Sequence, residues 1–498
     1  MVDALTGNVA DLVAETAGRS PDRPGLVDAA TGRTLTWAET DLATNAYAAH
    51  LAEAGLAEGD RVAIVLPNGP EFCVALFAVL RAGGIAVPAA ASSPEVPRLL
   101  ADSGASFVVG EADTDLPVLD VPDLAAVGEP RQAVRGGEDI AVLCYTSGTA
   151  GAPRGVMLSH RALLSNVAQC AQLKPPPVTA TDRVLLVVPL FHAYGLGPGL
   201  LQAASAGATA VLLDFFGTER ALSVCAEHQV TTLVGVPAMY QALVAADPER
   251  LAQSLASVRL LTSGAAPLSA AVLTAVKQAT GLPVYKGYGL TETGPVLTST
   301  LVGGVAKPGS VGRALPDVEL RLVDSDGRPL GTLADPDEEG WFDEDEPETG
   351  RVAARGPNLF SGYWPDGHGG PDADGWFTTG DVGYLDADGD LRLVDRANDL
   401  IIVNGFNVYP NEIERVLDEL PDVVESAAVG VRDERTGEQV VAVIVLRAGA
   451  ELTEEAVREH CAARLARFKV PASVRFVDEL PHSATGKVRR ASLRGSVA

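Results

Sequence analysis

Lysine, cysteine and aromatic residues are scarce in this sequence. Of its 498 residues, 38 are lysine or arginine but only six of these are lysine, aromatic residues make up 5%, and cysteine occurs five times. The cysteines lie far apart, in apolar or helical surroundings, and form no Cys-x-x-Cys pair. This pattern argues against a cysteine-rich metal site and a disulfide framework, and it predicts free thiols in a reducing compartment.

Long hydrophobic runs and an excess of positive charge are also lacking. The longest apolar runs, such as residues 184–190, are too short to cross a bilayer, and the first residues contain no basic segment followed by an apolar block. The formal net charge of −27 disfavours nucleic acid and anionic membranes as partners. We therefore predict a cytoplasmic protein, monomeric or homodimeric, with no transmembrane segment and no nucleic-acid partner.

Strands and helices alternate through the N-terminal part of the chain. Residues 25–28 and 35–37 have the pattern of a strand pair, and residues 42–54 that of an amphipathic helix. A buried strand at 60–66 is followed by an apolar helix at 71–82. This alternation predicts an α/β fold with a mostly parallel sheet. Because the chain is longer than one hydrophobic core usually serves, at least two domains are expected.

The C-terminal part of the chain has a different pattern. From Pro410 onward, the sequence predicts a helix, two strands, a second helix and a third strand, which form a compact α+β unit. Two Asp-x-Asp-Gly stretches, at 324–327 and 386–389, lack the twelve-residue ligand pattern of a calcium loop. We therefore predict hairpin turns at these two stretches.

A turn of small and hydroxyl-bearing residues follows the predicted strand at 141–144. It comprises Thr146, Ser147, Gly148, Thr149, Ala150 and Gly151, with the cation Arg154 just beyond. Glycine and alanine let backbone N–H groups approach a ligand closely, and hydroxyls add donors. Such donors followed by a cation suit phosphate oxygens, although a lone Ser-Gly-Thr is more often a plain turn between strands.

A second segment, further along the chain, combines glycines with an aromatic ring and oxygen ligands. Gly287, Tyr288 and Gly289 form a platform, and Thr291 and Glu292 supply oxygens. A hard cation such as Mg²⁺ binds carboxylate and phosphate oxygens together. Taken alone, Glu292 would be interpreted as a solvated surface charge; the phosphate-binding turn earlier in the chain favours the metal-binding interpretation.

Four further positions carry groups that could take part in chemistry. His192 lies where a strand breaks open, Asp381 is a carboxylate at a turn, and Lys487 lies on a glycine-flanked loop. The small residues at 264–266 follow a strand and suit the close approach of a flat ring. Each has a plain structural alternative: a core histidine, an Asx turn, a surface lysine and a helix-entry turn.

In this order along the chain, the segments resemble the signatures of the acyl-adenylate-forming enzymes, which include acyl-CoA synthetases, coumarate–CoA ligases, luciferases and the adenylation domains of peptide synthetases. The resemblance covers residues 8–490 and is closest to bacterial fatty-acyl-CoA synthetases. Three positions depart from the usual pattern: Ala150 replaces threonine, Arg154 replaces lysine, and Asn398 stands where lysine or aspartate is usual. Arginine keeps the charge but offers a planar fork in place of a point charge.

The resemblance implies a division into two domains. Residues 1–394 would form an N-terminal adenylation domain, made of sheets with packed helices, that holds ATP and the acid. Residues 395–498 would form a small, mobile C-terminal α+β domain that carries Lys487 and serves the CoA step. The hinge and the segment that closes against CoA are assigned to Asn398, Asn404, Gly405 and Phe406.

The resemblance also assigns the site residues. Catalytic roles fall on Lys487, Thr291, Glu292 and His192, with Glu292 as the Mg²⁺ ligand. ATP would be bound by Thr146, Ser147, Gly148, Thr149, Ala150, Gly151, Arg154, Gly264, Ala265, Ala266, Gly287, Tyr288, Gly289, Thr291, Asp381, Arg396 and Lys487. The acyl pocket would be lined by His192, Gly195, Gly235, Gly264 and Gly289.

By this resemblance, the chain uses ATP and Mg²⁺ to activate a monocarboxylic acid as acyl-AMP, releasing pyrophosphate, and then transfers the acyl group to CoA. Small and apolar pocket residues, with no aspartate after Phe191 to hold an amino group, favour a medium- or long-chain fatty acid. Three alternatives stay open: transfer to the thiol of an acyl carrier protein, an aryl-acid ligase of the coumarate type, and a nucleotide-binding relative without catalysis. Retention of Glu292, Asp381, Arg396 and Lys487 argues against the last.

Overall fold

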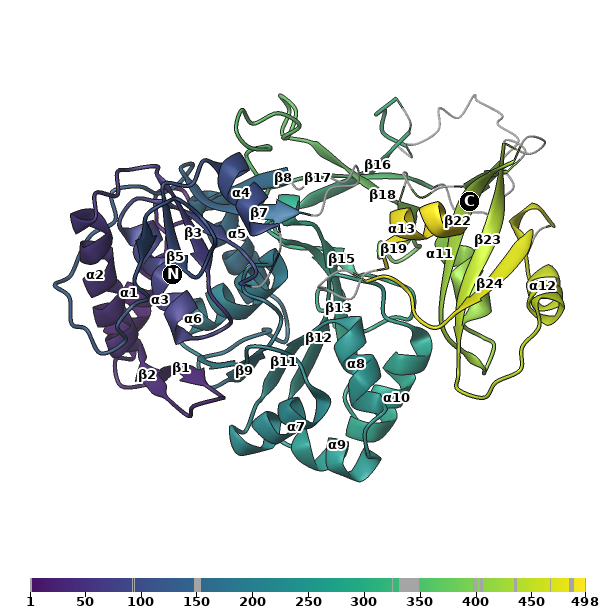
Figure 1. The fold of residues 1–498 in the computed structure, drawn as a ribbon, viewed down its shortest axis with the longest axis horizontal. Helices are drawn as coiled ribbons and strands as arrows, with labels where there is room; N and C mark the ends of the chain where they lie inside the picture. The colour runs from purple at the N-terminus through teal and green to yellow at the C-terminus, as the bar shows by residue number, and fades with distance from the viewer. Residues whose placement is uncertain are drawn as a thin grey trace. The chain divides into compact units, whose positions relative to one another are not determined.

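The computed structural model describes residues 2–497 except 92, 94, 147–153, 325, 331–348, 397–398, 400, 404–405, 434–436, 466 and 483–487 (Figure 1). Contacts within the chain divide it into two units. The larger unit comprises Met1–Leu320 and Ala354–Phe377, and the smaller unit comprises Arg321–Ala353 and Thr378–Ala498. The predicted fold class, α/β with a large N-terminal part and a small C-terminal α+β part, is confirmed. The domain boundary after residue 394 stays a prediction.

One sheet of the larger unit has six strands. Their order is β6 (Val118–Leu119), β5 (Phe107–Gly110), β3 (Arg61–Val65), β4 (Ile85–Pro88), β7 (Ile140–Thr146) and β8 (Arg154–Ser159). All neighbours run parallel except β7 and β8, which are antiparallel. The helix α3 (Pro70–Arg81) joins β3 to β4 and is buried on all sides from Phe72 to Leu80, which is why its sequence has no polar face.

A second sheet of the larger unit has nine strands. Their order is β15 (Arg313–Ala314), β14 (Val296–Ser299), β13 (Val284–Gly289), β12 (Leu260–Ser263), β11 (Thr232–Gly235), β9 (Arg183–Leu186), β10 (Thr209–Leu212), β1 (Pro24–Asp28) and β2 (Thr34–Thr36). The run from β13 to β1 is parallel, and the strands at both ends are antiparallel. The predicted strand pair and the mostly parallel sheet are confirmed.

Helices pack against both sheets of the larger unit (Figure 1). They are α1 (Asp11–Arg19), α2 (Trp37–Glu53), α4 (Val96–Ser103), α5 (His160–Ala171), the π-helix η1 (Gly195–Leu201), α6 (Gln202–Ala206), α7 (Thr218–Glu227), α8 (Pro237–Val244), α9 (Pro248–Ser254), α10 (Ala270–Thr280) and the 3₁₀ turn η2 (Thr291–Thr293). The helix α2 begins five residues before the predicted start at 42. Its start is fixed by a capping box, in which the backbone N–H of Glu39 donates to the Thr36 hydroxyl at 3.1 Å and the Glu39 carboxylate accepts from the Thr36 backbone at 2.8 Å.

Two further sheets belong wholly or mostly to the smaller unit. One has the order β16 (Glu319–Val323), β17 (Gly350–Arg355), β18 (Phe377–Leu385) and β19 (Leu391–Arg396), and the other has the order β21 (Phe406–Val408), β20 (Ile401–Val403), β23 (Gly437–Leu446) and β22 (Val423–Asp433), with β24 (Ser473–Val477) beside β23. The helices are α11 (Pro410–Leu417), α12 (Glu454–Ala462), η3 (Arg467–Lys469) and α13 (Arg490–Val497). The predicted helix–strand–strand–helix–strand order after Pro410 is confirmed.

The turn between β18 and β19 confirms one of the two predicted hairpins. The backbone N–H of Gly389 donates to the carbonyl of Asp386 at 2.8 Å. The Asp386 carboxylate accepts from the backbone N–H groups of Asp388 and Asp390 at 3.1 and 3.0 Å and pairs with Arg392 at 3.0 Å. The aspartates of this stretch thus shape the turn itself.

The buried interior contains all five cysteines, and all are free thiols, as predicted. Burial raises the pKa of Cys144 to about 12 and that of Cys461 to about 11. Among the helices that the structure describes, none combines the length and the apolar character that a membrane span needs.

Candidate nucleotide and acyl site

Three parallel neighbours, β11, β12 and β13, end at the same edge of the nine-stranded sheet. Gly235 at the end of β11 lies opposite Ser263 of β12, and Ser263 lies opposite Lys286 of β13. The backbone N–H of Gly264 donates to the carbonyl of Gly235 at 3.3 Å. Ligands of α/β proteins bind beyond the carboxyl ends of the strands. The register therefore brings two predicted acyl-pocket glycines next to the predicted adenine platform at 287–289.

Only the two ends of the predicted phosphate-binding turn belong to the described residues. Thr146 ends β7 and Arg154 begins β8, and the two lie opposite each other in antiparallel register. Arg154 is exposed, and its guanidinium lies 5.2 Å from the centre of the Tyr363 ring. The residues outside the described part of the turn are Ser147, Gly148, Thr149, Ala150 and Gly151. The turn thus joins two adjacent strand ends and has a cation at its exit.

Glu292 lies in the short turn η2 between β13 and β14. The hydroxyl of Tyr363 donates to Glu292 Oε1 at 2.7 Å, and the backbone N–H of Phe360 donates to the Glu292 carbonyl at 3.0 Å. Thr293 closes the turn, because its hydroxyl oxygen accepts from the backbone N–H of Leu290 at 2.9 Å. The predicted metal ligand is therefore held through both its side chain and its backbone.

Buried side-chain amides support this turn from below. The Asn166 amide makes two hydrogen bonds with the backbone of Val296, at 2.7 and 3.1 Å. The Asn358 amide donates to the carbonyl of Thr293 at 2.7 Å, and Gln169 donates to Asn358 Oδ1 at 3.3 Å. All three amides are at most 3% exposed. A buried, satisfied network of this kind gives the turn a single well-defined position.

Two backbone positions at this edge are under steric constraint. A Cβ atom on Gly289 would lie 1.8 Å from the carbonyl oxygen of Pro295, which excludes every other residue there. Ala265 has a φ of 68°, in the left-handed region, which costs a non-glycine residue about 1–2 kcal/mol. Strained backbone of this kind concentrates at ligand-binding segments, and Ala265 lies in the segment predicted to contact adenine.

His192 lies between β9 and η1, with its ring fixed by the backbone. The backbone N–H of Tyr194 donates to His192 Nδ1 at 3.1 Å. An N–H group can only donate, so Nδ1 accepts, and the neutral ring carries its proton on Nε2. The preceding segment is held by Asn68, which accepts from the backbone N–H of Leu190 at 2.9 Å and donates to the carbonyl of Val188 at 3.1 Å. His192 is thus a positioned hydrogen-bond donor.

Two tyrosine rings pack against glycines of the predicted acyl pocket. A Cβ atom on Gly264 would lie 2.8 Å from the ring of Tyr194, and one on Gly235 would lie 2.8 Å from the ring of Tyr240. Tyr240 is fully buried, and its hydroxyl donates to the carbonyl of Thr262 at 2.7 Å. A third predicted pocket residue, Gly195, lies against the backbone of the His192 segment. These glycines make room for aromatic rings.

The two residues predicted to bind the ribose belong to the smaller unit. Asp381 lies in β18, opposite Arg396 of β19 in antiparallel register. Asp381 is 7% exposed, and its backbone N–H donates to the Thr379 hydroxyl at 3.2 Å. The Arg396 side chain is outside the description of the structure. The register alone brings these two residues together.

Several predicted residues of the smaller unit lie outside the described residues. They are Lys487, Asn398, Asn404 and Gly405, while Phe406 begins β21 without a described side chain. Described residues hold the chain on both sides of the segment 483–487. Before it, His482 Nε2 lies 2.6 Å from Glu425 Oε1, and after it, the backbone N–H of Arg489 donates to the Pro481 carbonyl at 2.8 Å.

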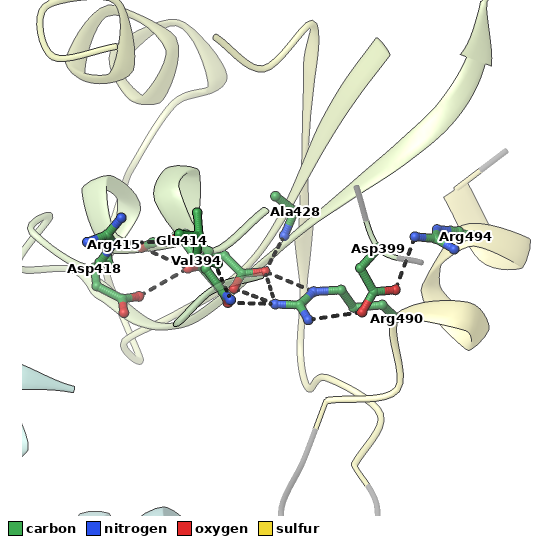
Figure 2. A network of polar contacts seen from close by, with 10 residues as sticks. Val394, Asp399, Glu414, Arg415, Asp418, Ala428, Arg490 and Arg494 are labelled. Carbon is green, nitrogen blue, oxygen red and sulfur yellow. Dashed lines mark hydrogen bonds and ion pairs between the residues drawn. The ribbon is translucent and has the colours of Figure 1, made fainter. Parts of the chain in front are cut away.

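Arg490 connects three elements of the smaller unit (Figure 2). Its guanidinium donates to both carboxylate oxygens of Glu414 on α11, at 2.9 and 2.6 Å, and lies 3.5 Å from Asp399. Arg494, one turn further along α13, pairs with the same Asp399 at 3.2 Å, and the backbone N–H of Ala428 donates to Glu414 at 2.8 Å. Burial raises the pKa of Glu414, and the positive charge of Arg490 opposes that rise.

The residues around Glu292 fit one hard cation. Mg²⁺ usually binds through one or two protein carboxylates together with substrate phosphates, and it keeps several water ligands. Glu292 offers one half-buried carboxylate close to the phosphate-turn cation Arg154, since both contact Tyr363. In the part of the chain that the structure describes, the group of three neighbouring candidate ligands is the Asp386, Asp388 and Asp390 turn, which belongs to the smaller unit.

Sequence reasoning did not predict the residues that support Glu292. These are Tyr363, Asn358, Asn166 and Gln169. One signal could have found two of them, because Asn166 and Gln169 are three residues apart on a helix whose other buried residues are mostly apolar. Tyr363 and Asn358 lie far along the chain from Glu292, and no local pattern connects them to it.

Two family models match the chain. The model described as AMP-binding enzyme matches residues 13–364, and the model described as AMP-binding enzyme C-terminal domain matches residues 412–487. The first match includes the phosphate turn, His192 and Glu292, and the second ends at Lys487.

The chain is also similar, over nearly its whole length, to proteins with named activities. It is 35% identical over 496 residues to indoleacetate–CoA ligase of Aromatoleum aromaticum, covering 94% of each protein. It is 31% identical over 540 residues to long-chain-fatty-acid–CoA ligase of Bacillus subtilis, covering 97% of this chain and 93% of the relative. The solved structure of ATP-bound MatB from Rhodopseudomonas palustris matches with a TM-score of 0.88 and 32% identity, over 98% of this chain and 99% of that one.

Proposed function

Since this chain belongs to the family of AMP-binding enzymes and is an AMP-forming acid–CoA ligase, we propose that its acid substrate carries a compact, flat tail such as an aromatic ring. The observation that supports this proposal is the pair of rings, Tyr194 and Tyr240, that lie against Gly264 and Gly235. We infer that these rings fill space that an extended alkyl chain would need, and that a flat acid would stack on Tyr194, because the Tyr240 ring is fully buried. The fatty acid predicted from the sequence is the alternative, and similar proteins are named for both classes.

In the first step, a carboxylate oxygen of the acid attacks the α-phosphorus of ATP, and the bond to pyrophosphate breaks. The carboxylate is already a nucleophile, so no general base is needed, and the protein contributes positioning and charge neutralisation. Arg154 and the turn that starts at Thr146 would bind phosphate oxygens, and Asp381 and Arg396 would bind the ribose. Mg²⁺ held by Glu292 would neutralise phosphate charge when bound.

Two side chains would act on the acid itself. His192 carries its proton on Nε2, because Nδ1 accepts from the Tyr194 backbone, and this N–H would orient the carboxylate. Lys487, on the evidence of its motif, would contact both the carboxylate and the α-phosphate. Gly287, Tyr288 and the segment 264–266 would enclose adenine.

In the second step, the CoA thiol attacks the carbonyl carbon of acyl-AMP, the carbon–oxygen bond to AMP breaks, and the thiol proton is lost. We propose that residues 395–498 move as a domain relative to residues 1–394, about a hinge at Asn398. This motion would withdraw Lys487 and bring Asn404, Gly405 and Phe406 to the CoA thiol. The cytoplasmic location and the monomeric or homodimeric state stay predictions.

The test is pyrophosphate release with Mg-ATP across benzoate, cinnamate, indoleacetate, octanoate and palmitate, with and without CoA. We expect turnover with one or more aromatic acids and thioester formation only when CoA is present. Turnover with palmitate alone would establish the fatty-acid alternative. Adenylate that never passes to CoA would indicate an acyl carrier protein as the acceptor.

The tyrosine rings can be tested separately. Tyr194→Ala should raise kcat/KM for octanoate relative to benzoate by about tenfold, because removing a ring creates room for several methylene groups. Tyr47→Phe, which removes a hydroxyl that donates to the Asp120 carbonyl elsewhere in the larger unit, is the control and should leave the ratio unchanged. An unchanged ratio in Tyr194→Ala would refute the role of this ring in substrate selection.

A further inference from the structure

The segment around Tyr363 lies along the strand that begins with the phosphate-turn cation. The backbone N–H of Ser361 donates to the Met157 carbonyl at 2.9 Å, and the backbone N–H of Trp364 donates to the Gly155 carbonyl at 2.8 Å. Tyr363 itself bridges to Val156 in antiparallel fashion. These contacts fix the Tyr363 backbone against β8, so the position of its side chain is set by two strand-like segments.

The Tyr363 side chain touches two charged residues of the predicted ATP site. Its hydroxyl donates to Glu292 Oε1 at 2.7 Å, and the guanidinium of Arg154 lies over its ring at 5.2 Å. A carboxylate only accepts hydrogen bonds, so the phenol acts as the donor. Within the described residues, no ion pair joins Arg154 to Glu292.

A cation and a carboxylate this close together can pair directly, and each would then be partly neutralised before any ligand arrives. A phenol between them prevents that pairing and still restrains both. Its hydroxyl occupies one carboxylate oxygen, and its ring face attracts the guanidinium. A planar guanidinium suits this ring face better than an ammonium, which is relevant because this chain has arginine where the family usually has lysine.

We propose that Tyr363 is a positioning residue that holds Glu292 for the metal ion and Arg154 for phosphate, and keeps the two from pairing with each other. This inference rests on the proposed roles of Glu292 and Arg154. Hydrogen-bond partners of a metal ligand typically change metal affinity by about 10–100-fold when removed. The hydroxyl and the ring should therefore have separable effects, one on the metal and one on the nucleotide.

The test compares two variants of Tyr363 by binding. Mn²⁺ affinity of the full chain with ATP is measured by electron paramagnetic resonance, and ATP affinity in EDTA by calorimetry. Tyr363→Phe keeps the ring and should weaken Mn²⁺ binding about tenfold while leaving metal-free ATP affinity unchanged. Tyr363→Leu loses the ring as well and should weaken metal-free ATP binding by about threefold in addition.

Controls separate this role from general damage. Tyr47→Phe removes one hydroxyl hydrogen bond outside the site and should change neither affinity. Arg154→Lys tests the ring contact without touching Tyr363, and should weaken metal-free ATP binding. Combining Tyr363→Phe with Glu292→Gln should add no further loss of Mn²⁺ affinity, because the hydroxyl acts through that carboxylate.

Either of two outcomes would overturn the proposal: unchanged Mn²⁺ affinity in Tyr363→Phe, or equal losses in the Tyr363→Phe and Tyr47→Phe variants. Failure of the proposed function looks different, because the wild-type chain would then bind Mn²⁺ and ATP but release no pyrophosphate with any aromatic acid. The binding readouts decide the role of Tyr363 in both cases.

Discussion

The surroundings of Glu292 in the larger unit and those of the Lys487 segment in the smaller unit are built from different chemistry. Glu292 is supported by uncharged groups, namely the Tyr363 hydroxyl and the buried amides of Asn166 and Asn358. The chain beside Lys487 is held by charged pairs, chiefly Arg490 with Glu414. Neutral hydrogen bonds fix a turn at little desolvation cost, whereas a buried ion pair depends on both partners. The turn around Glu292 should therefore keep its structure across pH and salt conditions, whereas the region around Arg490 and Glu414 should be sensitive to single charge changes.

The largest expected effect comes from breaking the ion pair between Arg490 and Glu414. Arg490→Met leaves Glu414 buried without its partner, and such a loss destabilises by about 3–5 kcal/mol. Urea unfolding of the full chain, with hydrogen exchange at Pro410–Leu417 to localise the change, measures it. Arg494→Met is the matched control, since its pair with Asp399 is more exposed and should contribute about 1 kcal/mol or less. Equal losses of stability in the two variants would contradict the expected difference between the buried pair and the more exposed pair.

The next effect concerns Lys487, which precedes Arg490 in the chain. Lys487→Ala should lower the rate of acyl-AMP formation by about 10²–10³-fold, because a preorganised charge at the reacting phosphate is lost. Thioester formation from synthetic acyl-AMP and CoA should change little, since the proposed role of Lys487 is confined to the first step. Pyrophosphate release and thioester formation are measured separately. Near-normal adenylation by the variant would disprove the role of Lys487.

Breaking the network of buried amides that supports Glu292 should have a smaller effect on stability. Asn358→Ala leaves the Thr293 carbonyl and the Gln169 amide without their partner in a buried place, which costs about 2–3 kcal/mol. Thermal unfolding gives the loss of stability, and Mn²⁺ binding with ATP shows whether Glu292 has shifted. A stable variant with normal Mn²⁺ affinity would show that this amide is dispensable.

Low pH should destabilise the larger unit through one titratable residue, His160. Its Nδ1 accepts from the backbone N–H of Val9 at 3.0 Å, which requires a neutral ring, and burial lowers its pKa to about 4. Unfolded histidine has a pKa of about 6.5, so the unfolded state binds more protons between these values and stability falls as pH drops. We expect a loss of about 2 kcal/mol between pH 7 and pH 5 from this residue. His160→Asn, which keeps an acceptor but does not titrate, should show a flatter dependence in urea unfolding at several pH values.

The same comparison explains what could be predicted from the sequence. Strands, helices and the hairpin at 386–389 were predictable because they depend on local periodicity and turn chemistry. The start of α2 was missed because the capping residues Thr36 and Glu39 precede the apolar pattern. The phosphate turn, Glu292 and Lys487 were found by motif, and their roles stay predictions.

The contacts that these supporting residues make were not predictable, because they join distant parts of the chain. Asn166 contacts Val296, 130 positions away, and Tyr363 contacts Glu292, 71 positions away. No local sequence pattern predicts such a contact. The acyl side shows the same limit: the glycines that suggested an open pocket lie against Tyr194 and Tyr240, which local sequence could not reveal.

The buried thiols have a practical consequence for studying motion in this protein. All five cysteines are free and buried, and burial keeps the thiols of residues such as Cys144 in the unreactive protonated form. A maleimide dye should therefore react selectively with a cysteine introduced at an exposed site, with no need to remove the natural ones. With one dye on each unit, fluorescence energy transfer would report changes in the distance between the dyes. The proposed rotation about Asn398 could then be followed during turnover.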